Sequence, residues 1–173
     1  QICHACASIE TDDVRLSHAM EGFVKDRKWV IFPRLSYENH LRIIEQERVL
    51  GEVFSDFAYN RLQDVPGAQR GIVSGGVSSA YVREVLADTQ DAVRTLELAV
   101  PHPLPERLVR KFLTGLTDVL VVEELDPVLE DALLRLCGQY HLAVTIHGRS
   151  TGETKIAGAN HYEDVRAAVD GFD

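Results

Sequence analysis

The feature that most constrains the fold of this chain is a regular alternation of short apolar runs and amphipathic helical patterns after residue 67. Short connections join each run to the next helical pattern, and this order repeats four times. Strands that follow one another through helices lie parallel in one sheet, with helices packed on both of its faces. The sequence therefore predicts a three-layer α/β/α fold with a mostly parallel sheet. The predicted strands are Gly71–Ser74, Thr95–Val100, Asp118–Glu123 and Leu142–Ile146.

Three residues mark where the helices of this fold are expected to begin. Pro105 and Pro127 stand at helix starts, where a fixed φ angle and a missing N–H suit the first turn. Ser78 is predicted to cap the helix that follows the first strand. The run Asp118–Glu123 is rich in β-branched residues, which is typical of a strand covered on both faces.

The residues before residue 67 form a different region. Lys28–Pro33 is a short apolar run, and Ser36 is predicted to cap a helix from about Tyr37. No strand pattern lies next to this helix, so we interpret it as a linker that follows an extended N-terminal arm. A turn signal at Asp64–Gly67 ends the region. The sequence thus predicts an arm and linker helix over residues 1–66 and the α/β domain over residues 67–173.

Charge and apolar content limit the partners of the chain. Its 173 residues carry 18 basic and 27 acidic side chains, for a formal net charge of -9, and so acidic a chain repels phosphate backbones. No apolar run reaches the roughly 18–20 residues of a membrane helix, and three cysteines are too few for an extracellular disulfide framework. We expect a cytoplasmic protein without nucleic-acid or membrane partners. Since residue 1 is Gln, we also expect a processed product or a piece of a longer protein.

A glycine-bearing turn is the first candidate binding element. Gly75 and Gly76 follow the first predicted strand, and Ser78 opens the next helix. Free N–H groups at such a helix start attract anions. The segment matches neither a dinucleotide fingerprint nor a P-loop, however. A tight turn with a serine cap is therefore the favoured interpretation, and an anion-binding turn is the alternative.

Two carboxylates form the second candidate. Glu123 and Glu124 end the most strand-like run, at the edge where open α/β sheets bind ligands. They are candidates for acid–base work or for contact with a basic partner, and equally for capping the next helix. His147 ends the fourth predicted strand on the same edge and His102 ends the second, and a solvated rim is favoured over a histidine cluster. The polar segment 149–154 is interpreted as a mobile surface loop.

The arm contains a third candidate, Cys3-His4-Ala5-Cys6. Two cysteines at this spacing make half a zinc site, but Cys137 is the only further thiol. Small apolar side chains are the favoured interpretation, and the closely spaced cysteines of a ferredoxin cluster are absent from the sequence. From the residues alone we predict no catalytic residue, no metal site and no self-sufficient active site.

Several stretches together resemble the α subunit of indolepyruvate:ferredoxin oxidoreductase. Pro103–Asp131 is similar to that family's pattern of PLPE, F, G, VLVVEE, P and E, and Gly71–Leu86 to its "GI…SGV…YV.E.L" segment. Lys28–Pro33, the helix containing His40, and Tyr59–Leu62 match the region upstream. The resemblance covers roughly residues 1 to 147, whereas the last part of the chain matches only loosely.

The resemblance implies a module of a larger enzyme. That family's subunit resembles a series of modules, and this chain looks like the one similar to the C-terminal domain of transketolase, preceded by its linker arm. The implied parent converts aryl-2-oxoacids such as indolepyruvate to acyl-CoA, with thiamine diphosphate, Mg²⁺ and [4Fe–4S] clusters. Its implied partners are other domains of the same chain, a β subunit, ferredoxin and coenzyme A, with a homodimer left open.

The same resemblance bears on the candidate residues. His4 matches a polar stretch of the family and is a candidate for the substrate side or an interface. Glu123 and Glu124 match the family's VVEE, for which no catalytic role is assigned. The domain itself is expected to be structural, closing over the thiamine domains and forming subunit contacts. The rival hypothesis is a stand-alone ligand-binding or regulatory module that holds a small anion or nucleotide at Gly75, Gly76 and the Glu123 edge.

Overall fold

The computed structural model of the chain describes residues 22–26, 29–89 and 92–172. The chain divides into two compact units between Glu45 and Gln46. The second unit holds the sheet. The predicted division of the chain at residue 66 stays a prediction.

The second unit contains a five-stranded sheet with the order β1-β3-β2-β4-β5. Strands β2, β3, β4 and β5 run parallel, and the short strand β1 pairs antiparallel with β3. This confirms the predicted α/β fold with a mostly parallel sheet. The strands are β1 (Arg61–Gln63), β2 (Arg70–Gly75), β3 (Arg94–Leu98), β4 (Asp118–Val122) and β5 (Thr145–His147).

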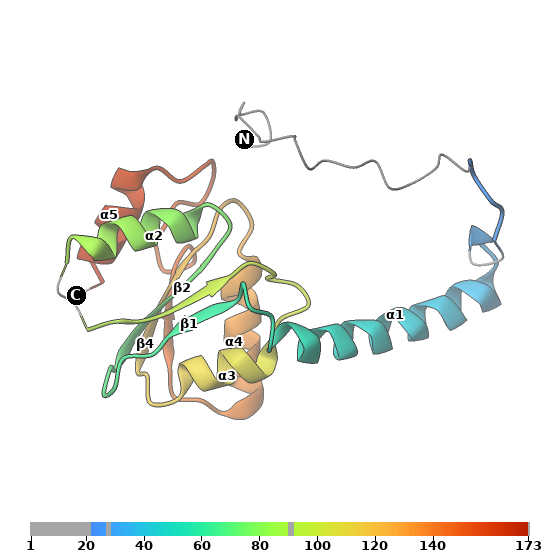
Figure 1. Cartoon of the computed structure of the whole chain (residues 1–173), viewed down its shortest axis with the longest axis horizontal. Coiled ribbons are helices and arrows are strands. Elements are labelled where there is room, and N and C mark those ends of the chain that lie inside the picture. The colour runs from blue at the N-terminus through green and yellow to red at the C-terminus, as the bar shows by residue number, and fades with distance from the viewer. Residues whose placement is uncertain (1–21, 27–28, 90–91, 173) are drawn as a thin grey trace, which may run out of the picture. The chain divides into compact units, whose positions relative to one another are not determined.

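Four helices cover the two faces of this sheet. Helices α2 (Ser78–Ala87) and α5 (Tyr162–Asp170) lie on one face, and α3 (Glu106–Leu113) and α4 (Val128–Tyr140) on the other (Figure 1). Each face has its own apolar cluster, and the buried side chains of β4 alternate between the two. A strand buried on both faces reads as a continuous apolar run, which is why β4 was the most recognisable strand in the sequence.

The helices begin where the two prolines predicted, but not where the two serines predicted. Helices α3 and α4 begin directly after Pro105 and Pro127, as predicted. The predicted cap at Ser78 is wrong, because Val77 is the N-cap of α2 and Ser78 lies inside its first turn. Helix α1 (Pro33–Phe54) begins four residues before the predicted Tyr37, since a proline is well tolerated in the first turn.

Strand β5 is shorter than the predicted run from Leu142 to Ile146. Helix α4 is closed by His141, whose φ angle of 53° turns the chain, and the Leu142 N–H donates to the Cys137 carbonyl at 2.9 Å. The chain reaches β4 only at Thr145, which donates to the Thr117 carbonyl at 2.8 Å. The first residues of the predicted run therefore close the end of helix α4 and do not belong to strand β5.

Candidate functional site

The carboxyl edge of the sheet is where most of the candidate residues from the sequence lie. We use this name for the Gly75–Ser78 turn, the loop after β4, the loop after β5, and Asn160. Asn160 is buried and lies at the centre of the edge. Its side-chain amide donates to Ser78 Oγ at 3.0 Å and to the Glu123 carbonyl at 3.1 Å, and its own N–H donates to Glu124 Oε1 at 2.7 Å. One asparagine thus connects three of the predicted site residues.

Glu123 caps helix α4. Its two carboxylate oxygens accept hydrogen bonds from the Leu129 N–H at 2.8 Å and the Glu130 N–H at 2.9 Å. Burial raises the pKa of Glu123, the nearby Glu130 carboxylate raises it further, and the backbone hydrogen bonds offset only part of this. Of the two roles that the sequence left open for this carboxylate, the structure shows the helix cap.

Glu130 is a buried carboxylate that sequence reasoning missed. It accepts hydrogen bonds from the Arg149 N–H at 2.9 Å and the Ser150 N–H at 3.0 Å, and a third from the Ser150 hydroxyl. Gly148 is part of the same arrangement, because a Cβ there would lie 3.0 Å from Glu130 Oε2. The segment predicted as a mobile surface loop is therefore folded around a buried charge.

The glycine turn opens onto a shallow groove of about 420 Å³. Gly76 has a φ angle of 60°, and no other group lies within 4 Å of the point where a Cβ would stand, so this residue faces open space. Arg61 and Arg83 line the groove, and Arg83 is paired with Glu97 at 2.8 Å. Ser78 is fully buried, and its hydroxyl is occupied by Asn160. The backbone of the turn, rather than the serine hydroxyl, is what remains accessible to a ligand.

The two histidines predicted to end the second and the fourth strand do not form a cluster. His147 lies between two carboxylates, with Nε2 3.1 Å from Asp118 Oδ1 and Nδ1 3.2 Å from Glu153 Oε1. His102 is exposed and lies 3.6 Å from Glu47. Burial lowers the pKa of His147, but its hydrogen bonds to both carboxylates and their charges outweigh this and raise the pKa above its usual value. Both ring nitrogens of His147 are occupied, so neither is available to a substrate.

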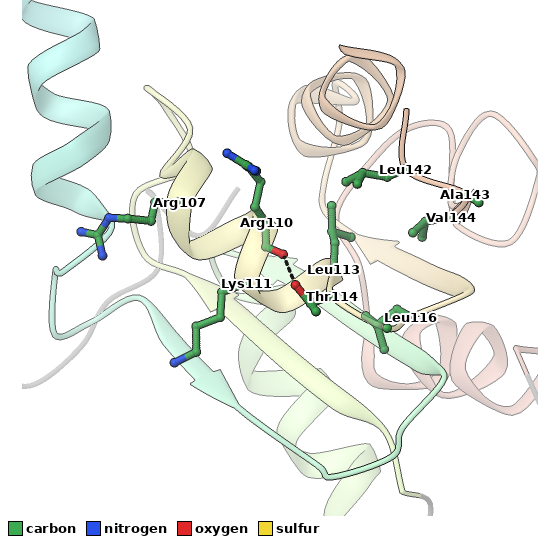
Figure 2. Close-up of a pocket in the computed structure, with 10 residues that line it drawn as sticks. Arg107, Arg110, Lys111, Leu113, Thr114, Leu116, Leu142, Ala143 and Val144 are labelled. Carbon is green, nitrogen blue, oxygen red and sulfur yellow. Dashed lines mark hydrogen bonds between the residues drawn. The ribbon is translucent and has the colours of Figure 1, made fainter. Parts of the chain in front are cut away.

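A second groove, of about 670 Å³, lies at the end of α3 (Figure 2). Its floor includes Leu113 and Leu116, and residues 142–144 form its far wall. Arg110 and Lys111 extend to different sides of the helix (Figure 2), and the Arg110 guanidinium stacks over the Tyr140 ring at 4.2 Å. This groove is an apolar shelf whose polar groups do not converge, which is not the arrangement that catalysis needs.

The described residues do not fit the metal groups of the implied parent enzyme. They contain no cluster of three or more histidine, cysteine or acidic side chains that could hold a metal ion. Cys137, the cysteine that lies among them, is buried in the core, and burial raises the pKa of its thiol. A thiolate ligand is disfavoured there. His4, Cys3 and Cys6 lie outside the described residues. In the same part of the chain, no helix is both long and apolar enough to cross a membrane.

Known proteins give a consistent comparison. The indolepyruvate oxidoreductase subunit IorA of Pyrococcus horikoshii is 35% identical over 123 residues, which is 70% of this chain and 19% of that subunit. The IorA of Methanothermobacter marburgensis is 28% identical over 175 residues, 99% of this chain and 28% of the subunit. The chain is homologous to a portion of IorA. It spans only 19% to 28% of the length of these relatives.

Solved structures agree on the fold. A 2-oxoglutarate:ferredoxin oxidoreductase from Magnetococcus marinus, solved with 2-oxoglutarate, coenzyme A and succinyl-CoA bound, matches 82% of this chain and 24% of its own with a TM-score of 0.50 and 18% identity. A split-gene transketolase, described as an inactive β4 tetramer, matches 67% of this chain and 43% of its own with a TM-score of 0.50 and 20% identity. No family model matches the chain. The predicted relationship to IorA and the transketolase-like fold are thus both confirmed.

Proposed function

We propose that this chain is the transketolase-C-like domain of an indolepyruvate:ferredoxin oxidoreductase. The homology with IorA, which extends over 70% to 99% of the chain, is the observation that carries the proposal. The enzyme would convert aryl-2-oxoacids to acyl-CoA and pass electrons to ferredoxin in the cytoplasm. Thiamine diphosphate, Mg²⁺ and [4Fe–4S] clusters would be bound by other parts of it.

Within that enzyme, we assign this domain a structural role between other domains and the β subunit. The state of its carboxylates supports this role. Glu123, Glu124 and Glu130 each accept hydrogen bonds from backbone N–H groups of the same chain. A carboxylate that holds the fold in this way is poorly placed to take a proton from a substrate, because the backbone donors stabilise its present position. The carboxyl edge would therefore support neighbouring domains as a rigid surface.

The proposal is tested by isolating the enzyme through this chain. An affinity tag is added to the native gene, and the purified material is assayed for indolepyruvate-dependent and coenzyme A-dependent reduction of ferredoxin. We expect activity in this material, and none in the recombinant 173-residue chain. Tagged material without turnover would contradict the proposal. So would micromolar binding of thiamine diphosphate to the recombinant chain, measured by calorimetry with Mg²⁺ present.

A further inference from the structure

Leu125 combines two unfavourable properties. Its φ angle is 63°, in the left-handed region that a side chain with a Cβ rarely adopts. Its side chain is also 62% exposed and belongs to neither apolar cluster of the fold. Within the described part of the chain, packing in the two apolar clusters does not offset the cost of leucine at this position.

The backbone conformation at Leu125 is imposed by its neighbours. Glu123 and Glu124 on one side are tied to α4 and to Asn160. The Leu125 carbonyl accepts a hydrogen bond from Arg149 Nη1 at 2.5 Å. The backbone conformation of the turn is therefore fixed, but it does not require leucine at this position. Asparagine or glycine would adopt the same φ angle at lower cost. A contact with a group outside this fold would stabilise the leucine side chain.

The surroundings of Leu125 indicate the chemistry of that contact. Val128, three residues on, is also exposed, at 48%. Two acidic side chains flank this pair: Asp126, whose side chain is 92% exposed, and Asp131, which is exposed in the first turn of α4. We call these four residues the Leu125 knuckle. Arg149 Nη1 lies 4.0 Å from Asp126 Oδ1, and the two carboxylates outnumber this one basic group. An apolar centre with an acidic border complements an apolar recess with a basic border.

We infer that the Leu125 knuckle docks into an apolar recess, bordered by lysine or arginine, on another part of the IorA-type subunit. The inference rests on the proposed function for the identity of this partner. The chain spans only 19% to 28% of the curated relatives' length, so most of such a subunit lies outside it. Strain retained at an exposed apolar residue is the pattern expected where a contact offsets it.

The first arm of the test needs only the recombinant chain. Leu125→Asn relieves the backbone strain and removes an exposed apolar side chain, so we expect the melting temperature to rise by about 3 °C. A fall in melting temperature would show that the leucine already packs within the chain, and would overturn the inference. His141→Asn is the matched control, because His141 is the other described non-glycine residue with positive φ, and it is exposed at the far end of α4.

The second arm uses the tagged assembly. Asp131→p-benzoylphenylalanine places a photo-cross-linker at the border of the knuckle, and mass spectrometry identifies the peptide it captures. We expect a peptide of the IorA-type subunit, from outside this chain, that contains both aliphatic and basic residues. The yield should fall about tenfold with Leu125→Asn and stay unchanged with His141→Asn. Equal yields for the two variants, capture of a second copy of this chain, or absence of any cross-link would overturn the inference.

The two proposals fail separately. Loss of oxidoreductase activity in the tagged wild-type material would contradict the proposed function, whatever the cross-link shows. An active assembly in which Leu125→Asn leaves the cross-link unchanged would contradict the docking inference alone.

Discussion

Two groups of carboxylates, one around the start of α4 and one around His147, are bonded in different ways. At the carboxyl edge, Glu123 and Glu130 accept hydrogen bonds mainly from backbone N–H groups. Beside β5, Asp118 and Glu153 face the side chain of His147. The first group stabilises loops and a helix end, whereas the second joins one titratable side chain to two others. Both groups contain residue types that catalysis uses, yet only their partners show what they do.

The partners also determine how each group responds to pH. Backbone N–H donors keep their hydrogen at every pH in the physiological range, so the donors to Glu123 and Glu130 do not themselves titrate. His147 loses its proton as the pH rises through its raised pKa, and it then loses the attraction of both carboxylates. Side-chain pairs that remain partly exposed contribute little in any case, because water and salt screen them. We therefore expect large effects at the carboxyl edge and small, pH-dependent ones beside β5.

The largest expected effect is at Glu130. Glu130→Gln turns an acceptor of three hydrogen bonds into a group whose amide N–H₂ opposes one of the donors. Since the site is buried and the lost bonds are charge-assisted, we expect a loss of about 3 kcal/mol in the free energy of unfolding, measured in urea. Glu84→Gln, at an exposed position of α2, is the control and should change little. Equal stability of the two variants would show that the hydrogen bonds of Glu130 do not stabilise the fold.

A smaller loss is expected at Asn160. Asn160→Ala removes the amide that joins Ser78 to the Glu123 carbonyl and leaves the buried Ser78 hydroxyl without its donor. We expect a loss of about 2 kcal/mol in the free energy of unfolding by urea titration. Gln139→Ala, on the exposed side of α4, is the matched control. An unchanged stability for Asn160→Ala would mean that the carboxyl edge is held by other contacts.

The smallest effect is expected at His147, and it depends on pH. Because its pKa is raised in the folded state, the stabilisation is complete below about 6.5 and is lost as the pH rises through the folded value. The pKa values of Asp118 and Glu153 are lowered in the folded state. The stability that these two carboxylates contribute is therefore present above a pH of about 4.5 and is lost as the pH falls through their folded pKa values. His147→Gln should cost about 1 kcal/mol at pH 6 and less at pH 8.5, by urea unfolding at both values. A loss that is the same at both pH values would contradict the assignment.

Parts of the fold were evident from local sequence. The parallel strands follow apolar runs, and Pro105 and Pro127 immediately precede helices α3 and α4, because a missing N–H is harmless there. Strand β1 was not predicted. Its three residues are too few for a periodic pattern, and it forms because Arg61–Gln63 pairs with β3 more than thirty residues later.

The chain's family and its layered fold were determined by the sequence itself, since runs such as Asp118–Glu123 carry both the apolar pattern and the resemblance to IorA. The work of the candidate residues was decided by tertiary structure. Nothing in the sequence joins Asn160 to Ser78, or Glu130 to Ser150, because the partners are 82 and 20 residues apart. Glu130 carried one weak signal, as an acidic residue in the first turn of a helix. A hydrogen bond depends on distance in space, and only folding brings these groups within reach.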